Sequence, residues 1–222
     1  MAQRYHVAFL EEHRDLLQEP VLLVGSRQYD YDVHDLGTEL RRLGVDDLVG
    51  IDILDGPGVD AVVDITDTSS AWVDEHAGTF GTVICMEVLT HLPAPFVAAA
   101  TLQRLARPGG TVILSECIVR KFTRMPGDYW RFTHDGLAAL FDDVELDPDR
   151  ARLARTRDKD GHLEPLGRTL PEVLAERHPH ESKVGHLVRR AHRRFFAKGD
   201  FELSRLLPEL TILAAGRRKD DR

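Results

Sequence analysis

Cysteine is scarce in this chain: Cys85 and Cys117 are the only two among 222 residues. Two cysteines cannot form a disulfide framework, so the sequence points to a reducing compartment, and we expect a cytoplasmic protein. No apolar run approaches the ~20 residues that a membrane-spanning helix needs, and the first residues contain no apolar signal region. The expectation is therefore a protein without a membrane partner.

An overall excess of basic charge is also missing. The formal net charge is −8, which disfavours a protein whose whole surface binds nucleic acid. The charge is uneven, because residues 1–150 contain 12 basic and 26 acidic groups whereas residues 151–198 contain 12 and 6. Within the basic part, residues 184–195 have an apolar stripe at helical spacing with arginines on the other side, which is typical of a helix packed on its domain.

Short apolar runs alternate with helical patterns from residue 21 to residue 141, and this rhythm predicts βαβ units with a parallel sheet. Strands are expected at residues 21–25, 48–53, 61–63, 82–86, 111–118, 144–146 and 211–215. Helices are expected at residues 35–43, 70–76, 93–106, 133–141 and 184–195, with a further, poorly periodic one within 1–18. Residues 107–110, Arg-Pro-Gly-Gly, are expected to form a turn.

In an open α/β sheet, ligands bind outside the carboxyl ends of the strands. Gly25 follows the first strand, but Arg27 and Tyr29 stand where a dinucleotide-binding loop has further glycines, so a dinucleotide is disfavoured. The second and third strands end at Asp52 and Asp64, which suit ribose hydroxyls and an adenine amino group. A strand-end aspartate also commonly caps the next helix, so it is the pair, behind a glycine turn, that favours a nucleoside-like ligand.

Six segments, in this order and spacing, resemble the class I S-adenosylmethionine-dependent methyltransferases, and within them a small-molecule subset. They are residues 24–27, 50–60, 63–64, 87–91, 107–110 and 128–133. The resemblance covers roughly residues 20–145. Two positions depart from the family pattern: Leu23 stands where an acidic residue is usual, and Arg27 where a second glycine is usual.

The resemblance implies an α/β, Rossmann-like fold with a seven-stranded, mostly parallel sheet and helices on both faces. The basic, mostly helical pattern between the last two expected strands adds a helical insertion before the last strand. Together they divide the chain into a cofactor-binding core with an N-terminal helix (1–149), a basic lid over the substrate (150–208), and a final strand with a charged tail (209–222).

The resemblance also implies a set of contacts to S-adenosylmethionine. Gly25 and Ser26 would lie beside its methionine end, and Asp52 would hold the ribose. Ile53, Asp64 and Ile65 would contact the adenine, and Met86 and Glu87 would lie against the methionyl chain or the sulfonium.

Methyl transfer to oxygen or nitrogen needs an aligned acceptor and a base that removes its proton. His91, after the fourth strand, is the first candidate for that base, and His134 is the second. The alternative is that His91 only packs at the start of the next helix. The loop after the fifth strand supplies the candidate residues that contact the acceptor: Asp128, Tyr129, Trp130 and Arg131. Their aromatic rings and arginine would suit a flat or carboxylated molecule. The alternative is that the aromatic residues only anchor the loop.

The leading hypothesis is a small-molecule O- or N-methyltransferase that acts on a specialised metabolite, with an acceptor that could be anionic. Two alternatives stay open: a protein that binds the cofactor without transferring methyl groups, suggested by the two departures, and an RNA-modifying enzyme that uses the basic helix. No metal is expected, because the histidines at 178, 180, 186 and 192 match no compact ligand set. The oligomeric state is open, with a homodimer as one option.

Overall fold

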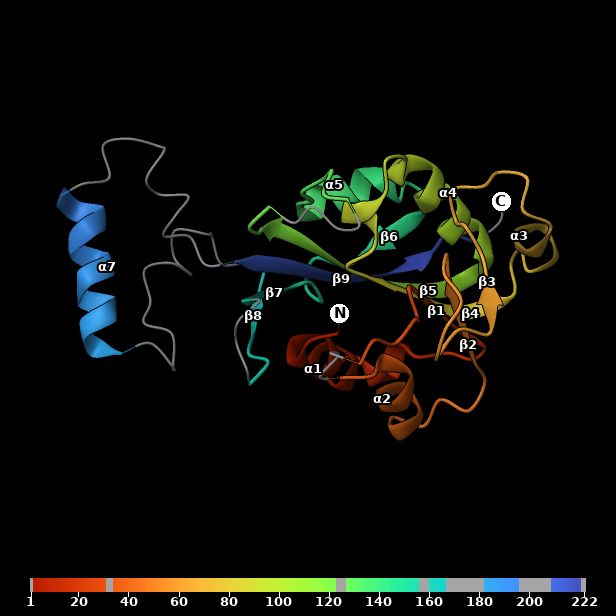
Figure 1. The fold of residues 1–222 in the computed structure, drawn as a ribbon, viewed down its shortest axis with the longest axis horizontal. Helices are drawn as coiled ribbons and strands as arrows, with labels where there is room; N and C mark the ends of the chain where they lie inside the picture. Colours follow the sequence, from red (N-terminus) through yellow and green to blue (C-terminus); the bar gives the residue numbers. More distant parts are fainter. Residues whose placement is uncertain are drawn as a thin grey trace.

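The computed structural model describes residues 2–30, 34–122, 127–155, 160–166, 182–195 and 209–220 (Figure 1). Its helices are α1 (Arg4–Glu12), α2 (Leu36–Arg42), α3 (Ala71–Glu75), α4 (Pro95–Leu105), α5 (His134–Leu140) and α7 (Lys183–Phe195), with short 3₁₀ turns η1 (Arg14–Leu16) and η2 (Leu89–His91). Its strands are β1 (Val21–Val24), β2 (Leu48–Asp52), β3 (Ala61–Val62), β4 (Phe80–Met86), β5 (Ala106–Val119), β6 (Val144–Leu146), β7 (Arg152–Arg155), β8 (Leu163–Pro165) and β9 (Leu210–Arg218).

One twisted sheet organises the described residues. Its strands follow the order β3-β2-β1-β4-β5-β9-β7-β8, and β6 also pairs with β9. The strands from β3 to β5 are parallel, whereas β9 runs antiparallel to β5. The chain builds outward from β1 to β3 and then returns to place β4 on the other side of β1. This reversal opens a crevice at the carboxyl ends of β1 and β4.

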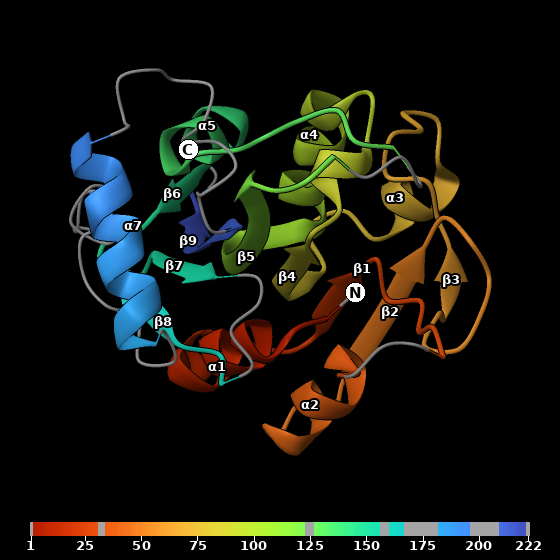
Figure 2. The same cartoon turned by 60° about the vertical axis from the view of Figure 1, so that its left-hand side comes forward.

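Both faces of the sheet are covered, which explains why its central strands read as continuous apolar runs. In β1, Val21 and Leu23 pack into one buried cluster with α1 and α2, while Leu22 and Val24 pack into the other with α3, α4 and α5. Figure 2 shows these two groups of helices on opposite sides of the sheet. The α/β fold with helices on both faces is therefore as the sequence predicts.

The number of strands differs from the expected seven. The described residues form a nine-stranded sheet, because β6 and β7 pair in succession along the same antiparallel partner, β9, and β8 adds to β7. The insertion expected to be helical thus begins with strands. Its first strand has only Leu153 and Ala154 buried between two arginines, too short a pattern to be recognised in the sequence.

The turn expected at residues 107–110 is also wrong. These residues belong to β5, whose pairing with β4 shifts register between Phe80 and Thr82. Gly109 has a positive φ of 68° within this irregular stretch, so the glycines allow a distorted strand where a chain reversal was expected.

The basic helix is confirmed as α7, but three side chains of its apolar stripe are exposed. Val184, Leu187 and Val188 are 71%, 66% and 62% exposed. The segments 167–181 and 196–208 on either side of it, with His178 and His180, lie outside the described residues. No helix in the described parts of the chain is long and apolar enough to cross a membrane.

Candidate functional site

The crevice at the carboxyl end of β1 contains a small pocket. Its walls come from α1, from the loop after β1, from the residues before α2 and from the end of β4, and they include His6, Gly25, Ser26, Asp35 and Met86. Three of these belong to the set that the resemblance assigns to the cofactor. The pocket therefore lies where the sequence places the methionine end of that cofactor.

The loop after β1 is shaped by close backbone packing. Gly25 has a φ of +72°, and a Cβ there would lie 2.7 Å from Val88 Cγ2. A Cβ on Gly50 would lie 2.2 Å from the carbonyl oxygen of Gly58, so β2 also needs a glycine beside this loop. Ser26 is 7% exposed and its buried Oγ has no hydrogen-bond partner. A buried hydroxyl without a partner at a glycine turn fits a site that awaits a polar ligand group.

Asp52 ends β2 as expected, whereas Asp64 lies two residues beyond β3, which ends at Val62, and both carboxylates also support local turns. The Asp52 carboxylate accepts hydrogen bonds from the backbone N–H groups of Leu54 (3.0 Å) and Arg27 (3.3 Å). Asp64 Oδ1 accepts from the backbone N–H and the hydroxyl of Thr66, at 2.8 and 2.6 Å, which leaves Oδ2 for a ligand. Each oxygen of Asp52 keeps a second lone pair for a ribose hydroxyl.

The two isoleucines beside these aspartates differ. Ile53 is 58% exposed, so it can cover an adenine ring as expected. Ile65 is 5% exposed and packs in the core, because its side chain is directed away from the crevice edge. Only its backbone is available to an adenine, which departs from the expected contact.

The departures at Leu23 and Arg27 have clear structural roles. Leu23 is 4% exposed and packs in the cluster that includes Tyr5 of α1. The Arg27 guanidinium lies over the Tyr29 ring, 4.8 Å from its centroid, and a Cβ on Gly56 would meet Arg27 Nε at 2.7 Å. Arg27 therefore fills the space above a glycine of the neighbouring loop while still lining the pocket.

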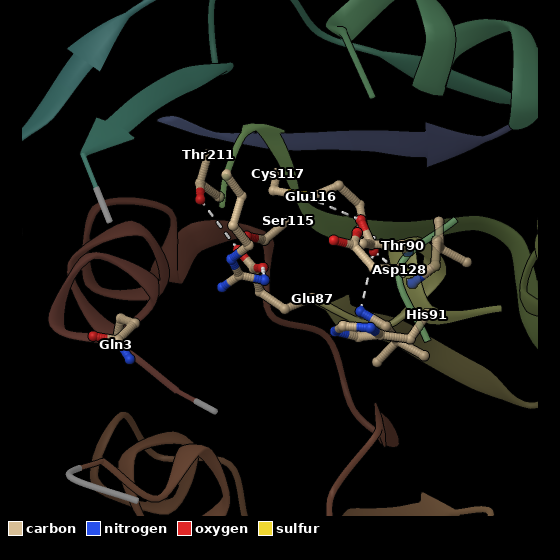
Figure 3. Close-up of polar contacts among 12 residues, drawn as sticks. Gln3, Glu87, Thr90, His91, Ser115, Glu116, Cys117, Asp128 and Thr211 are labelled. Carbon is tan, nitrogen blue, oxygen red and sulfur yellow. Dashed lines mark hydrogen bonds and ion pairs between the residues drawn. The ribbon is translucent and has the colours of Figure 1, made fainter. Parts of the chain in front are cut away.

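A buried polar cluster surrounds Glu87 at the end of β4 (Figure 3). Glu87 is 7% exposed and has a φ of +57°, a left-handed conformation that is costly for a residue with a Cβ. Its carboxylate pairs with Arg120 at 2.8 Å and accepts hydrogen bonds from Tyr5 (3.4 Å) and Thr211 (3.2 Å). Burial alone would raise the pKa of Glu87, but the neighbouring His6 and Arg120 outweigh it and hold the pKa below its ordinary value.

His6 connects this cluster to the pocket. Its Nδ1 accepts a hydrogen bond from the backbone N–H of Gln3 at 3.0 Å, so the ring proton lies on Nε2, which is 3.0 Å from Ser115 Oγ and 3.8 Å from Glu87. Burial lowers the pKa of His6, which keeps the ring neutral. Glu87 is thus an ionised carboxylate whose charge is balanced by Arg120, and it is less available to a sulfonium than the resemblance implies.

His91 is held in one orientation by a backbone carbonyl. Its Nδ1 hydrogen-bonds to the carbonyl oxygen of Gly127, and because a carbonyl only accepts, Nδ1 must carry the proton. The lone pair of the neutral ring then lies on Nε2, which has no hydrogen bond to any described residue. His91 is half-buried at the end of η2. This is the arrangement that a general base requires.

His134, the second candidate base, is placed differently. It begins α5, its Nε2 is buried without a hydrogen-bond partner, and its Nδ1 lies 3.6 Å from Asp135. An acceptor cannot reach this buried nitrogen, whereas the free Nε2 of the half-buried His91 is not enclosed. The geometry therefore favours His91.

Three of the four candidate acceptor residues in the loop 127–132 are engaged in contacts within the loop or with the end of the η2 turn. Arg131 forms a two-point ion pair with Asp128, one contact being 2.9 Å, and also donates to the Trp130 carbonyl at 2.8 Å. Trp130 Nε1 donates to the Leu92 carbonyl at 2.9 Å. With its guanidinium engaged in this way, Arg131 is poorly placed to bind a carboxylated acceptor.

Tyr129 is the member of this loop left for an acceptor. Its ring is 57% exposed and lies over Gly127, the residue whose carbonyl orients His91. Among the described residues, no group of three or more histidine, cysteine or acidic side chains is arranged to hold a metal ion.

The sequence gives no signal for Tyr5, His6 or Arg120, and Glu116 is likewise not among the site residues predicted from it. Tyr5 and Glu87 are 82 residues apart, and no local spacing announces such a contact. Glu116 lies in an apolar strand, and an acidic residue inside a buried run is a signal that could have been recognised.

Comparisons with known proteins identify the family and the fold. A family model described as "Methyltransferase domain" matches residues 31–148. A ubiquinone biosynthesis O-methyltransferase from Methylococcus capsulatus is 46% identical over 48 residues, which cover 22% of this chain and 20% of that protein.

Two solved structures share the fold. An S-adenosylmethionine-dependent methyltransferase from Archaeoglobus fulgidus superposes with a TM-score of 0.53 at 12% identity, over 98% of this chain and 95% of that one. The 1,6-didemethyltoxoflavin-N1-methyltransferase from Burkholderia thailandensis, solved with S-adenosylhomocysteine, superposes with a TM-score of 0.50 at 14% identity, over 96% of this chain and 76% of that one. Since the family model spans more than half of its residues, the chain belongs to the methyltransferase domain family, with the class I fold of S-adenosylmethionine-dependent enzymes.

Proposed function

We propose that this protein transfers a methyl group from S-adenosylmethionine to an oxygen or nitrogen atom of a small-molecule acceptor. The observation that carries the proposal is the fixed tautomer of His91, whose basic nitrogen Nε2 is unoccupied at the carboxyl end of β4. The matched relative is an O-methyltransferase and a structural neighbour is an N-methyltransferase, so both acceptor atoms are compatible with the family.

The cofactor supplies the transferable methyl group on its sulfonium. Gly25 and Ser26 hold its methionine end, because the glycine lets the backbone approach and the Ser26 hydroxyl is buried without a partner. Asp52 binds the ribose hydroxyls, while the exposed Ile53 side chain and Asp64 Oδ2 contact the adenine. Glu87 shapes the end of β4 beside Met86.

On the acceptor side, His91 Nε2 removes the proton from the attacking oxygen or nitrogen, and the Tyr129 ring supports a flat acceptor. The engaged state of Arg131 gives no support to an anionic acceptor. The lid expected at residues 150–208 begins with β7 and β8, which belong to the sheet, so we assign the lid to the part of the insertion that contains α7. The exposed apolar side chains of α7 give it a surface that can cover a ligand. A specialised metabolite remains the proposed class of acceptor.

Titration calorimetry with S-adenosylmethionine and S-adenosylhomocysteine, with NAD as a control, tests the cofactor. Micromolar binding of the first two and none of NAD is expected. Production of S-adenosylhomocysteine across a panel of phenols and amines then tests methyl transfer. Binding without turnover on any acceptor would favour a protein that uses the fold without methyl transfer, and absence of binding by folded, ligand-free protein would refute the proposal.

Asp52→Ala should weaken cofactor binding by about 1–3 kcal/mol, a loss of about 5- to 150-fold, because ribose hydroxyls then lose a charged acceptor. Asp55→Ala is the matched control, since Asp55 is exposed in the same loop. Calorimetry should show wild-type affinity for the control. Equal affinities for both variants would mean that β2 does not end at the ribose.

A further inference from the structure

A buried carboxylate from the neighbouring strand lies directly beneath the turn that carries His91. Glu116 belongs to β5 and is 0% exposed. We propose that Glu116 is a positioning residue for methyl transfer, which fixes η2 so that His91 and the loop 127–132 are presented to the acceptor. This inference rests on the proposed function of the same site.

Four hydrogen bonds converge on the Glu116 carboxylate (Figure 3). Its Oε1 accepts from the backbone N–H groups of Val88 (3.1 Å) and Leu89 (2.7 Å), and its Oε2 accepts from the backbone N–H (3.0 Å) and hydroxyl (2.7 Å) of Thr90. The η2 turn has no capping side chain of its own. Glu116 therefore satisfies, from another strand, the free N–H groups that begin this turn.

The turn held in this way supports the acceptor loop. The Thr90 carbonyl accepts a hydrogen bond from the Tyr129 backbone N–H at 3.0 Å, and the next residue, His91, bonds to the Gly127 carbonyl. Both contacts depend on where the turn places residues 90 and 91. A shift of η2 would consequently move the base and the loop together.

A carboxylate is needed here because the donors approach both of its oxygens. A carboxamide has one oxygen and one NH₂ group, so glutamine at this position would direct N–H groups against Thr90 or against Val88 and Leu89 in either orientation. Burial and the nearby charge of Glu87 raise the pKa of Glu116 to about 8. The hydrogen bonds from Thr90 and Leu89 oppose this shift, because a carboxyl group that faces only donors is favoured in its ionised form. Such an unfavourable position for a charge indicates that these contacts serve a specific purpose.

The test reads His91 directly and needs no acceptor. The two ring nitrogens of a neutral histidine fixed as one tautomer have well-separated ¹⁵N resonances, which approach each other when tautomers exchange. We expect the wild-type protein with S-adenosylhomocysteine to show one tautomer at His91, assigned by its loss in His91→Asn, and Glu116→Gln to show averaged resonances.

Thr111→Val is the matched control, since it removes a buried hydroxyl without a partner from the same strand and should keep the wild-type spectrum. A wild-type His91 spectrum in folded Glu116→Gln would overturn the proposal. If that variant does not fold, Thr90→Val, which removes one of the four donors, carries the test, and an unchanged spectrum there would overturn it equally.

Turnover with catechol as the acceptor probe adds a second measurement. Glu116→Gln should lower kcat by up to about 10²-fold, the effect of a misplaced catalytic group, with the affinity for S-adenosylmethionine unchanged. In a His91→Asn background, Glu116→Gln should lower kcat hardly any further. If Glu116 had only a general structural role, the losses in kcat from the two changes would multiply. Failure of the proposed function would show separately, as wild-type protein that binds no S-adenosylmethionine.

Discussion

Replacing His91 with alanine should lower kcat by about 10²- to 10⁴-fold, the usual contribution of a general base, with little change in cofactor affinity. The reason lies in its hydrogen bond: Nδ1 is committed to the Gly127 carbonyl, and Nε2 alone is left for a proton from the acceptor. His91 does not line the described pocket, so the cofactor should not sense its loss.

Two companion variants separate base chemistry from loop anchoring. His91→Asn retains a side-chain N–H that can still reach the Gly127 carbonyl, but it has no basic nitrogen, so we expect it to be as slow as the alanine variant. His134→Ala should keep nearly full activity. Steady-state kinetics with a fixed acceptor decides the matter: an active asparagine variant would reduce His91 to an anchor, and an inactive His134 variant would reverse the assignment.

Glu87→Ala should lower the free energy of unfolding by about 3 kcal/mol or more. The Arg120 side chain is 19% exposed, and without Glu87 its mostly buried guanidinium would lose the counter-charge that lies 2.8 Å away. Tyr5 and Thr211 would each lose a buried acceptor as well. The left-handed backbone at residue 87 is strained for alanine as it is for glutamate, so the substitution gains no stability from the backbone.

Urea unfolding of Glu87→Ala, Arg120→Met and the double variant measures this coupling. The double variant should be more stable than the sum of the two single losses predicts, because it leaves no unpaired charge behind. Glu116→Ala would be a poor control, as it disturbs the η2 turn. Additive losses in the cycle would show that the ion pair itself matters little and that the cluster acts through packing.

The central strands and the ends of β1, β2 and β4 were predictable because each is a short apolar run followed at once by a glycine or an acidic residue. Asp52 and Ile53 therefore lie at the end of β2, where the sequence places them, whereas Asp64 lies two residues beyond the short β3. The same reasoning misplaced Ile65, since a residue next to a strand end can turn either toward the crevice or into the core, and only packing decides.

The polar interior of the site could not be predicted in the same way. The contact of Thr211 with Glu87 joins residues 124 positions apart, and it exists only because β9 inserts beside β5. The pairing of Asp128 with Arg131, by contrast, has a spacing of three residues and a visible charge pattern. This charge pattern argues against the prediction that Arg131 binds the acceptor.

The arrangement of strands around β9 bears on how acceptor choice could change during evolution. The insertion leaves the sheet after β8 and returns at β9, and the two ends are joined through β7, which pairs with both. A loop closed by such paired ends tolerates changes of length, since doubling it costs only ~0.6 kcal/mol of closure entropy. If residues 167–208 form the proposed lid, they can be exchanged for a segment of different size and chemistry without rebuilding the methyl-donor site. We therefore expect grafts in this segment to alter acceptor specificity.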